Sequence, residues 1–455
     1  MIGQEKNDVY TDLRSCQSRK FEVAWTQKTP DSNHQKFPMT PGTHTQNQIH
    51  HFPNGLTLIS ESMPWCESVS CSMLVPCGSN DDPSGRLGLS NLTCEMALRG
   101  AGQYDSRPLI EAFENLGVDR GEALGNTHTT YSVATLSENL PLILPVVADI
   151  LRRPHFPADQ LDAGKSVIEQ EIISVEDDPA GKVMQELTRI HLPAPWGLPC
   201  HGTLESLAEM TIDEIRRHHA QRYQPDGMIV SIAGKIDWLQ LVDLIGELFG
   251  DWRPQVRPVI VETPTTKRTI HIPYDSAQTH IGIAFDEVAF RHPDYLLAWG
   301  AVGILSGGMS SRLFTEVREK RGLCYSVGAS YYSMRDRGGV SCYCGTSAER
   351  AQESLDVLLA ELRRLRLGVT EKEVELLKIR AKSHLVMQQE STGSRASSIA
   401  RDWYHLGRIR PMTEIKDKID SLNKTAIDDF LDRSPERPLT LATLGTECLT
   451  IGDDS

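Results

Sequence analysis

The sequence lacks the features that would place the protein in a membrane, on nucleic acid or outside the cell. It contains no run of about 18 apolar residues, so it predicts no membrane-spanning helix. Its 61 acidic residues exceed its 47 lysines and arginines, and the formal net charge of −14 argues against a nucleic-acid partner or an anionic membrane surface. Its ten cysteines show no disulfide framework, and no apolar segment typical of a secretory signal is visible. We therefore expect a cytoplasmic protein with reduced thiols.

The length of 455 residues is enough for two domains of about 200 residues each. Residues 1–46 are rich in Pro, Thr, Gln and His and poor in aliphatic side chains. Such a segment cannot bury enough apolar surface to fold alone, so we expect a disordered polar extension. The folded part is expected to begin at residue 47.

An internal repeat divides the rest of the chain. Residues 206–215 match residues 421–430 without a gap, and residues 144–153 match residues 355–364 at nearly the same separation. Neighbouring elements repeat in the same order, which favours a duplicated domain. The stretch after Trp252 is rich in proline, as is typical of a linker.

We therefore predict an N-terminal domain at 47–254, a linker at 255–268 and a C-terminal domain at 269–455. Hairpin signals alternate with long helical patterns, so each domain is expected to be α+β, a mainly antiparallel sheet packed with helices. The elements expected in the first half are a hairpin of strands 56–59 and 69–75 with Asn54-Gly55 as a turn signal, strands at 127–135 and 228–233, and helices at 85–100, 141–153 and 157–192.

The helix expected at 85–100 carries an unusual polar face. Asn91, Cys94 and Glu95 stand at positions i, i+3 and i+4, which share one face of a helix. This is the geometry of the zinc-binding pattern H-x-x-E-H, in which two histidines bind the metal and the glutamate is the general base. None of the three positions has the residue that the pattern requires. The helix has the spacing of a zinc-peptidase site but not the two histidines and the glutamate that this chemistry needs.

Further short motifs follow along the chain. They are GS at 78–79, EIISVEDDP at 171–179, HGTLESL at 201–207, YQPDGM at 223–228, GGMSSRLF at 307–314 and REKRGLCYSV at 318–327. Together they resemble the pitrilysin/insulinase family of zinc peptidases, over about residues 50–450. Within that family the chain resembles the short bacterial branch related to mitochondrial processing peptidase and the bc1 core proteins. The resemblance implies a fold of the processing-peptidase type.

The resemblance places the family's zinc site on unsuitable residues. The first zinc histidine falls on Asn91 and the general-base glutamate falls on Cys94. The second histidine falls on Glu95, and the third ligand falls on Glu171, which is retained. A neutral amide is a poor zinc ligand, and position 94 has no carboxylate to take a proton from a metal-bound water. We therefore expect no metal and no cofactor in this chain.

The C-terminal half retains another part of the family's catalytic apparatus. The resemblance implies that an arginine and a tyrosine hold the substrate carbonyl, and these roles fall on Arg318 and Tyr325. A guanidinium and a phenol are suitable donors to an oxygen that gains negative charge in the transition state. The structural alternative is that Arg318 pairs with Glu316 or Glu319 and that Tyr325 lies in the core.

The strand expected at 127–135 bears on substrate binding. The stretch from Asn126 to Tyr131 resembles the edge strand on which the family holds a peptide by β-addition. The implied substrate-binding residues are Asn126, Thr127, His128 and Thr129. The alternative is an ordinary strand of a sheet.

Three functions are compatible with these patterns. The favoured one is a non-zinc-binding subunit of a heterodimeric zinc endopeptidase, which acts on peptides beside a homologous subunit that holds zinc on an intact H-x-x-E-H motif. The second is a proteolytically inactive structural or binding protein, like the bc1 core subunits. The third is a metallopeptidase with displaced ligands, for which the candidates are His128, His201, His218 and His219.

A basic cluster lies outside these motifs. Arg363, Arg364 and Arg366 lie close together in a helical stretch of the second half. We expect them to form a solvated helix face and not a binding patch.

Overall fold

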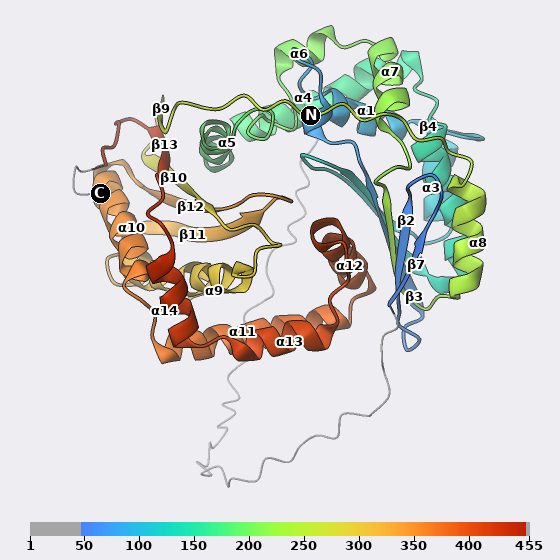
Figure 1. The fold of residues 1–455 in the computed structure, drawn as a ribbon. Helices are drawn as coiled ribbons and strands as arrows, with labels where there is room; N and C mark the ends of the chain where they lie inside the picture. Colours follow the sequence, from blue (N-terminus) through green and yellow to red (C-terminus); the bar gives the residue numbers. More distant parts are fainter. Residues whose placement is uncertain (1–46, 452–455) are drawn as a thin grey trace, which may run out of the picture. The chain divides into compact units, whose positions relative to one another are not determined.

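The computed structural model describes residues 47–451, and the polar extension expected at 1–46 lies outside them. The described residues form one compact unit with two large sheets that are packed with helices (Figure 1). This confirms the α+β fold class expected from the sequence. None of the helices between residues 47 and 451 has both the length and the apolar composition needed to cross a bilayer.

The first sheet has six strands in the order β1-β2-β8-β3-β7-β6. They are β1 (Asn47–His51), β2 (Thr57–Ser62), β3 (Ser68–Val75), β6 (Asp119–Leu124), β7 (Thr129–Leu136) and β8 (Ile229–Gly234). Within this order, β2 and β8 run parallel and the other neighbours run antiparallel.

The second sheet has five strands in the order β11-β12-β10-β13-β9. They are β9 (Thr269–Pro273), β10 (Gln278–Glu287), β11 (Cys324–Ser333), β12 (Gly338–Ser347) and β13 (Thr440–Gly445). Here β13 and β9 run parallel and the other neighbours run antiparallel. Strands β9, β13, β10, β12 and β11 thus repeat the arrangement of β2, β8, β3, β7 and β6. The sequence repeat is confirmed as a repeat of topology.

Each half adds its own helices. Those of the first half are α1 (Leu89–Ala97), α2 (Ser106–Glu114), α3 (Leu140–Arg152), α4 (Leu161–Glu176), α5 (Pro179–His191), α6 (Leu204–Glu209), α7 (Ile212–Arg222) and α8 (Trp238–Phe249), with the short strands β4 (Gly100–Ala101) and β5 (Tyr104–Asp105) after α1. Those of the second half are α9 (Tyr295–Ser306), α10 (Ala351–Arg366), α11 (Glu371–Gln389), α12 (Thr392–Leu406), α13 (Met412–Ser421) and α14 (Lys424–Arg433).

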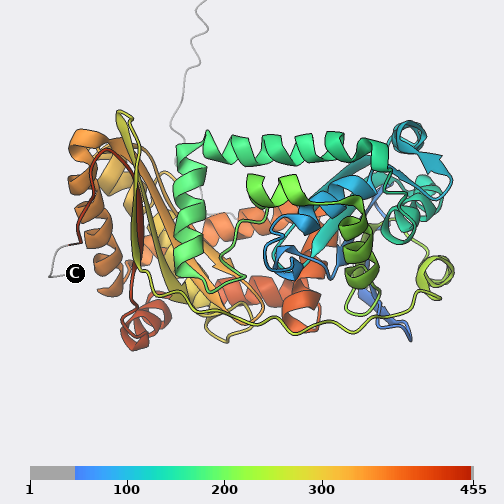
Figure 2. The same cartoon turned by 90° about the horizontal axis from the view of Figure 1, so that it is seen from above.

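One helix of each half packs against the sheet of the other half (Figures 1 and 2). Helix α5 lies on β10 and β13, where Val183 and Leu187 pack with Ala284. Helix α12 lies on β2, β3 and β8, where Ile399 packs with Ile59. Because α5 and α12 occupy corresponding places in the two repeats, the exchange is reciprocal. It joins the two halves on either side of the linker predicted at 255–268.

A buried ion pair accompanies this exchange. Glu61 on β2 and Arg395 on α12 are each about 2% exposed, and the guanidinium donates to both carboxylate oxygens at 2.5 and 2.9 Å. Beside them, the hydroxyls of Ser70 and Thr392 lie 2.8 Å apart. A buried charge is costly unless it is paired, so the ion pair favours one position of α12 on the first sheet.

Two details of the predicted element order are wrong. The helix expected at 157–192 is two helices, because Pro179 cannot continue α4 and instead starts α5, with Asp178 as its N-cap. The turn at Asn54-Gly55 joins β1 to β2, and β8 lies between β2 and β3. The strands at 56–59 and 69–75 therefore do not form a hairpin.

Candidate functional site

Helix α1 is held in place at its first turn. The carboxylate of Asp82 accepts hydrogen bonds of 2.7 Å from the backbone N–H groups of Gly88 and Ser90. Gly88 has a φ of 92°, and a Cβ at this position would lie 2.6 Å from the carbonyl oxygen of His201. Glycine permits both the backbone conformation and the close approach. The start of α1 is therefore packed against the segment that contains His201.

Asn91 contacts the retained residue of the predicted zinc site. Its Nδ2 donates a hydrogen bond of 2.8 Å to Oε2 of Glu171 on α4. The Nδ1 of His201 lies 3.2 Å from the same oxygen. The structure thus brings Asn91 and Glu171 together, as the resemblance implied. It adds His201, which the sequence analysis named as the start of the HGTLESL motif and as a candidate displaced ligand.

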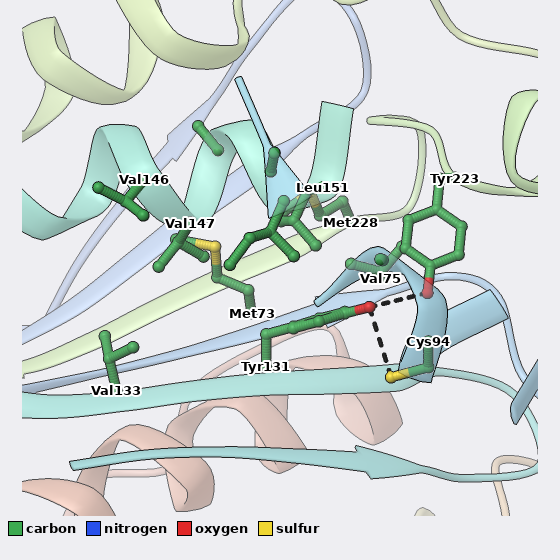
Figure 3. Close-up of a cluster of buried hydrophobic side chains, with 14 of the residues drawn as sticks. Met73, Val75, Cys94, Tyr131, Val133, Val146, Val147, Leu151, Tyr223 and Met228 are labelled. Carbon is green, nitrogen blue, oxygen red and sulfur yellow. Dashed lines mark hydrogen bonds between the residues drawn. The ribbon is translucent and has the colours of Figure 1, made fainter. Parts of the chain in front are cut away.

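Cys94 points into the core, toward Tyr131 (Figure 3). The residue is 7% exposed, and its Sγ accepts a hydrogen bond of 3.5 Å from the hydroxyl of Tyr131. That hydroxyl also lies 2.9 Å from the hydroxyl of Tyr223. Burial raises the pKa of the Cys94 thiol to about 12, so the thiol is protonated at neutral pH. A buried thiol in this state is neither a nucleophile nor a ready metal ligand.

Glu95 is bound by an arginine of the same helical stretch. Its Oε1 accepts hydrogen bonds from Nε and Nη2 of Arg99, at 3.0 and 2.7 Å. Strand β6 contacts α1, and burial together with the nearby Glu95 raises the pKa of Glu122 on this strand. The face of α1 that the sequence singled out is therefore bordered by β6, one of the two edge strands of the first sheet.

The residues at the predicted zinc site do not fit a zinc ion. Zinc requires thiolate, imidazole or carboxylate donors that converge on one point. Here an amide N–H is directed at Glu171, the Cys94 thiol is turned into the core, and Glu95 is held by a cation. Among residues 47–451, no three His, Cys, Asp or Glu side chains are grouped so that they could hold a metal ion.

The histidines of the displaced-ligand alternative lie in separate environments. His218 is 3.0 Å from the hydroxyl of Ser90, and burial lowers its pKa to about 3. His219 is 2.9 Å from the carbonyl oxygen of Leu151. The Nδ1 of His128 lies 2.9 Å from the hydroxyl of Thr127. His201 alone of the four adjoins Glu171, so these side chains do not form a second metal site.

Arg318 and Tyr325 lie against each other on the surface of the second half. Arg318 belongs to the last turn of the π-helical segment Phe314–Glu319, and its Cζ is 5.1 Å from the ring centroid of Tyr325. Tyr325 is the extra residue of a β-bulge in β11, which is an edge strand, and is 83% exposed. π-helical turns and bulges often occur at functional sites, because they redirect side chains.

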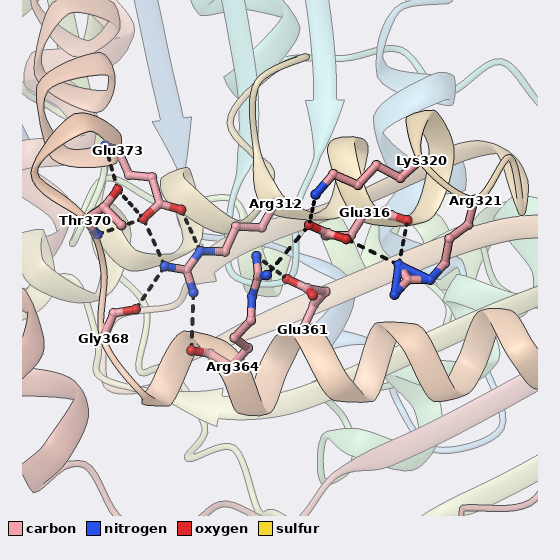
Figure 4. A network of polar contacts seen from close by, with 9 residues as sticks. All are labelled: Arg312, Glu316, Lys320, Arg321, Glu361, Arg364, Gly368, Thr370 and Glu373. Atoms are coloured by element: carbon pink, nitrogen blue, oxygen red, sulfur yellow. Dashed lines mark hydrogen bonds and ion pairs between the residues drawn. The ribbon is translucent and has the colours of Figure 1, made fainter.

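The structural alternative for this pair does not hold. Glu316 is paired with Lys320, Arg321 and Arg364, at 2.7, 3.2 and 3.6 Å (Figure 4). No carboxylate of the described residues lies within ion-pair distance of Arg318, whose guanidinium is over the rings of Phe314 and Tyr325 instead. Tyr325 is not a core residue. The pair is therefore exposed and available to a ligand, although its role stays a prediction.

The expected substrate strand is wrong in its position. Asn126, Thr127 and His128 lie in the loop between β6 and β7, and Thr129 begins β7, which is paired on both sides. The edge strand next to β7 is β6, which the sequence analysis missed because its residues Asp119–Leu124 include no β-branched or aromatic side chain. Substrate contacts by residues 126–129 stay a prediction.

The structure thus has two halves with the same strand order, and the residues at the positions that the resemblance assigned to zinc do not fit that ion. Two family models match the chain: Insulinase (Peptidase family M16) over residues 57–195, and Peptidase M16 inactive domain over residues 209–380. The chain belongs to peptidase family M16.

The matches to curated relatives cover most of the chain. A protein of Bacillus subtilis (strain 168) named as the uncharacterized zinc protease YmxG is 29% identical over 377 residues, which are 81% of this chain and 91% of the relative. The uncharacterized zinc protease Rv2782c of Mycobacterium tuberculosis (strain H37Rv) is 28% identical over 403 residues, which are 86% of this chain and 92% of the relative.

Solved structures show the same fold. A peptidase M16 inactive domain from Pseudomonas fluorescens superposes with a TM-score of 0.80 at 20% identity, over 89% of this chain and 99% of that chain. A chain of complex III2 from Candida albicans gives a TM-score of 0.74 at 20% identity, over 88% and 96%. At these identities the likeness concerns the fold alone.

Proposed function

We propose that this chain is the subunit without zinc ligands in a two-subunit zinc endopeptidase. The zinc would be held by a homologous partner with an intact H-x-x-E-H motif, where it would activate water for peptide hydrolysis. The proposal is supported by the relatives that are named zinc proteases, and by the residues at positions 91, 94 and 95. These residue types are unsuited to binding zinc, which is why the proposal places the metal in the partner.

The observation that carries the proposal is the exposed pair of Arg318 and Tyr325. Neither side chain contributes to the core, and the guanidinium is not neutralised by a carboxylate of residues 47–451. Held in this way, Arg318 and the Tyr325 hydroxyl can donate hydrogen bonds to the carbonyl oxygen of a bound peptide. Donors fixed in advance stabilise the negative charge that develops on this oxygen. A purely structural protein has no need of such a pair.

The same proposal assigns peptide binding to β6. Its one neighbour in the first sheet is β7, so the other edge of its backbone is open to an added strand. This edge borders the α1 face that carries Asn91 and Glu95. In this proposal, residues 126–128 would contact the peptide from the loop at the end of β6.

Co-purification tests the partnership. The tagged full-length chain would be isolated from the cells that produce it, and bound proteins would be identified by mass spectrometry. We expect a chain of similar size with an intact H-x-x-E-H motif, and chelator-sensitive peptide cleavage by the assembly. Isolation of the chain alone, without zinc and without cleavage, would contradict the proposal and favour an inactive structural protein of this fold.

A further inference from the structure

A cavity of about 420 Å³ lies in the second half, away from Arg318 and the α1 face. Helices α9, α10 and α14, the end of β10 and the segment 434–439 surround it. Most of its lining residues are aliphatic or aromatic, among them Phe285, Val302, Leu305, Leu359, Leu362 and Phe430. An apolar cavity of this kind does not hold ordered water well and favours an apolar guest.

Three arginines and two glutamates also line this cavity, which leaves one net positive charge. Arg437 is paired with Glu287 at 2.8 Å. Arg366 donates to the carbonyl oxygens of Ser434 and Pro435 at 2.9 and 3.1 Å, and so holds the segment that closes the cavity. Two of the three arginines are thus occupied by structural contacts.

Arg363 is different from both. It is exposed, lines the cavity, and makes no hydrogen bond or ion pair with another residue of the described part of the chain. Its neighbour Arg364 is turned to Glu316 and Glu361, in the network of Figure 4, and does not line the cavity. The basic cluster that we expected to be a solvated helix face therefore divides into two structural arginines and Arg363.

The size, the lining and the charge point to one class of ligand. The cavity is nearly three times the roughly 150 Å³ that accommodates benzene, so it has room for a chain of about 16 carbons. Burial of each CH₂ group of such a chain is favourable, because it removes apolar surface from water. The net charge of one matches a single carboxylate, and a guanidinium binds a carboxylate through two parallel hydrogen bonds.

We propose that this cavity binds a long-chain fatty acid, with the acyl chain among the apolar residues and the carboxylate on Arg363. The ligand is the free acid and not a membrane lipid. The site is separate from the proposed peptide site, so its occupation does not depend on the peptidase proposal.

Binding of palmitate to the purified full-length chain tests this inference. The readout is displacement of cis-parinaric acid, a fatty acid whose fluorescence rises in an apolar site, with palmitate, methyl palmitate and phosphatidylcholine vesicles as competitors. We expect saturable displacement by palmitate, at least about tenfold weaker displacement by the methyl ester, and none by vesicles. Equal displacement by acid and ester, or displacement by vesicles alone, would overturn the proposal.

Two variants and a matched control locate the site. Arg363→Ala removes an exposed side chain and should weaken palmitate binding about tenfold while leaving the ester unaffected. Leu362→Trp, at a half-buried position of the wall, should reduce binding of both because it fills the cavity. Arg364→Ala is the control and should bind palmitate like the wild type. Unchanged binding in both Arg363→Ala and Leu362→Trp would show that palmitate binds elsewhere and that the inference is wrong.

Discussion

The guanidinium of Arg318 lies over the ring of Tyr325, with Cζ 5.1 Å from the ring centroid. The two residues come from a helical segment and a strand. Arg318 ends a π-helical turn, and Tyr325 is the bulged residue of an edge strand. Both irregularities interrupt regular hydrogen bonding and so have a cost in stability. Their joint effect is to present two hydrogen-bond donors side by side on the surface.

The Tyr325→Phe variant removes one of these donors and keeps the ring beneath Arg318. In the assembly with the zinc-carrying partner, we expect kcat to fall about 100-fold and KM to change little, because the hydrogen bond strengthens only in the transition state. Steady-state kinetics with a fluorogenic peptide measures both constants. Arg321→Ala is the control, since Arg321 pairs with Glu316 and should leave kcat at the wild-type value. A KM effect alone would show that Tyr325 merely binds the peptide.

The Cys94→Glu variant restores the general-base residue of the zinc pattern at a position that this fold has buried. We expect the free energy of unfolding to fall by about 3 kcal/mol or more, because a carboxylate would enter the core beside Tyr131 without a cation to pair with it. Urea unfolding followed by circular dichroism measures this loss. Cys94→Ser has a similar size and no charge, and it should cost much less. Equal stability of Cys94→Glu and the wild type would contradict the inward orientation of this side chain.

The buried ion pair between Glu61 and Arg395 should contribute to the stability of the packing of α12 on the first sheet. Either Glu61→Leu or Arg395→Met leaves one charge buried and unpaired, so each should lower the free energy of unfolding by about 3–5 kcal/mol. The double variant removes both charges and should lose far less than the sum of the two. A thermodynamic cycle of the three variants measures the coupling. Additive losses would mean that the two groups do not interact.

Buried histidines make the stability dependent on pH. Burial lowers the pKa of His218 to about 3 in the folded protein, whereas the unfolded chain has the ordinary value of about 6.5. Between these values the unfolded chain binds a proton that the folded chain does not, so stability falls as pH decreases from about 6.5 toward 3, by up to about 1.4 kcal/mol per pH unit for this residue. The His218→Gln variant should show a smaller slope between pH 6.5 and 5. His292 is exposed, so His292→Gln is the control and should keep the wild-type slope. An unchanged slope for His218→Gln would contradict the burial of a neutral imidazole at this position.

The fold was predictable in its repeat but not in its exchange of helices. Matching segments such as 206–215 and 421–430 gave two copies of one arrangement, and the sheets show the same strand order in both. The packing of α5 and α12 on opposite sheets leaves no such signal, because an amphipathic helix reveals that it has an apolar face and not which sheet covers it. The break before α5 was visible in the Asp178-Pro179 pair, which is a start signal for a helix.

One contact of the candidate site was predictable from the sequence, whereas the orientations of its side chains were not. The resemblance placed Asn91 and Glu171 at one site, and the structure contains a hydrogen bond between them. The inward turn of Cys94 could not be predicted, since it depends on Tyr131 and Tyr223 from distant segments. Likewise, the bulge at Tyr325 depends on the register of β11 against β12, which the sequence does not reveal.

The most direct test of the account is a mixing experiment with the purified subunits. Chelator-sensitive cleavage of a peptide would be measured for this chain alone, for the co-purifying partner alone, for the mixture, and for the mixture with the Arg318→Ala variant. The account predicts full cleavage only in the mixture of the two wild-type subunits. In the mixture with Arg318→Ala, the cleavage rate should be lower by about 100-fold or more. Zinc-dependent cleavage by this chain without a partner, or wild-type activity in the Arg318→Ala mixture, would contradict it.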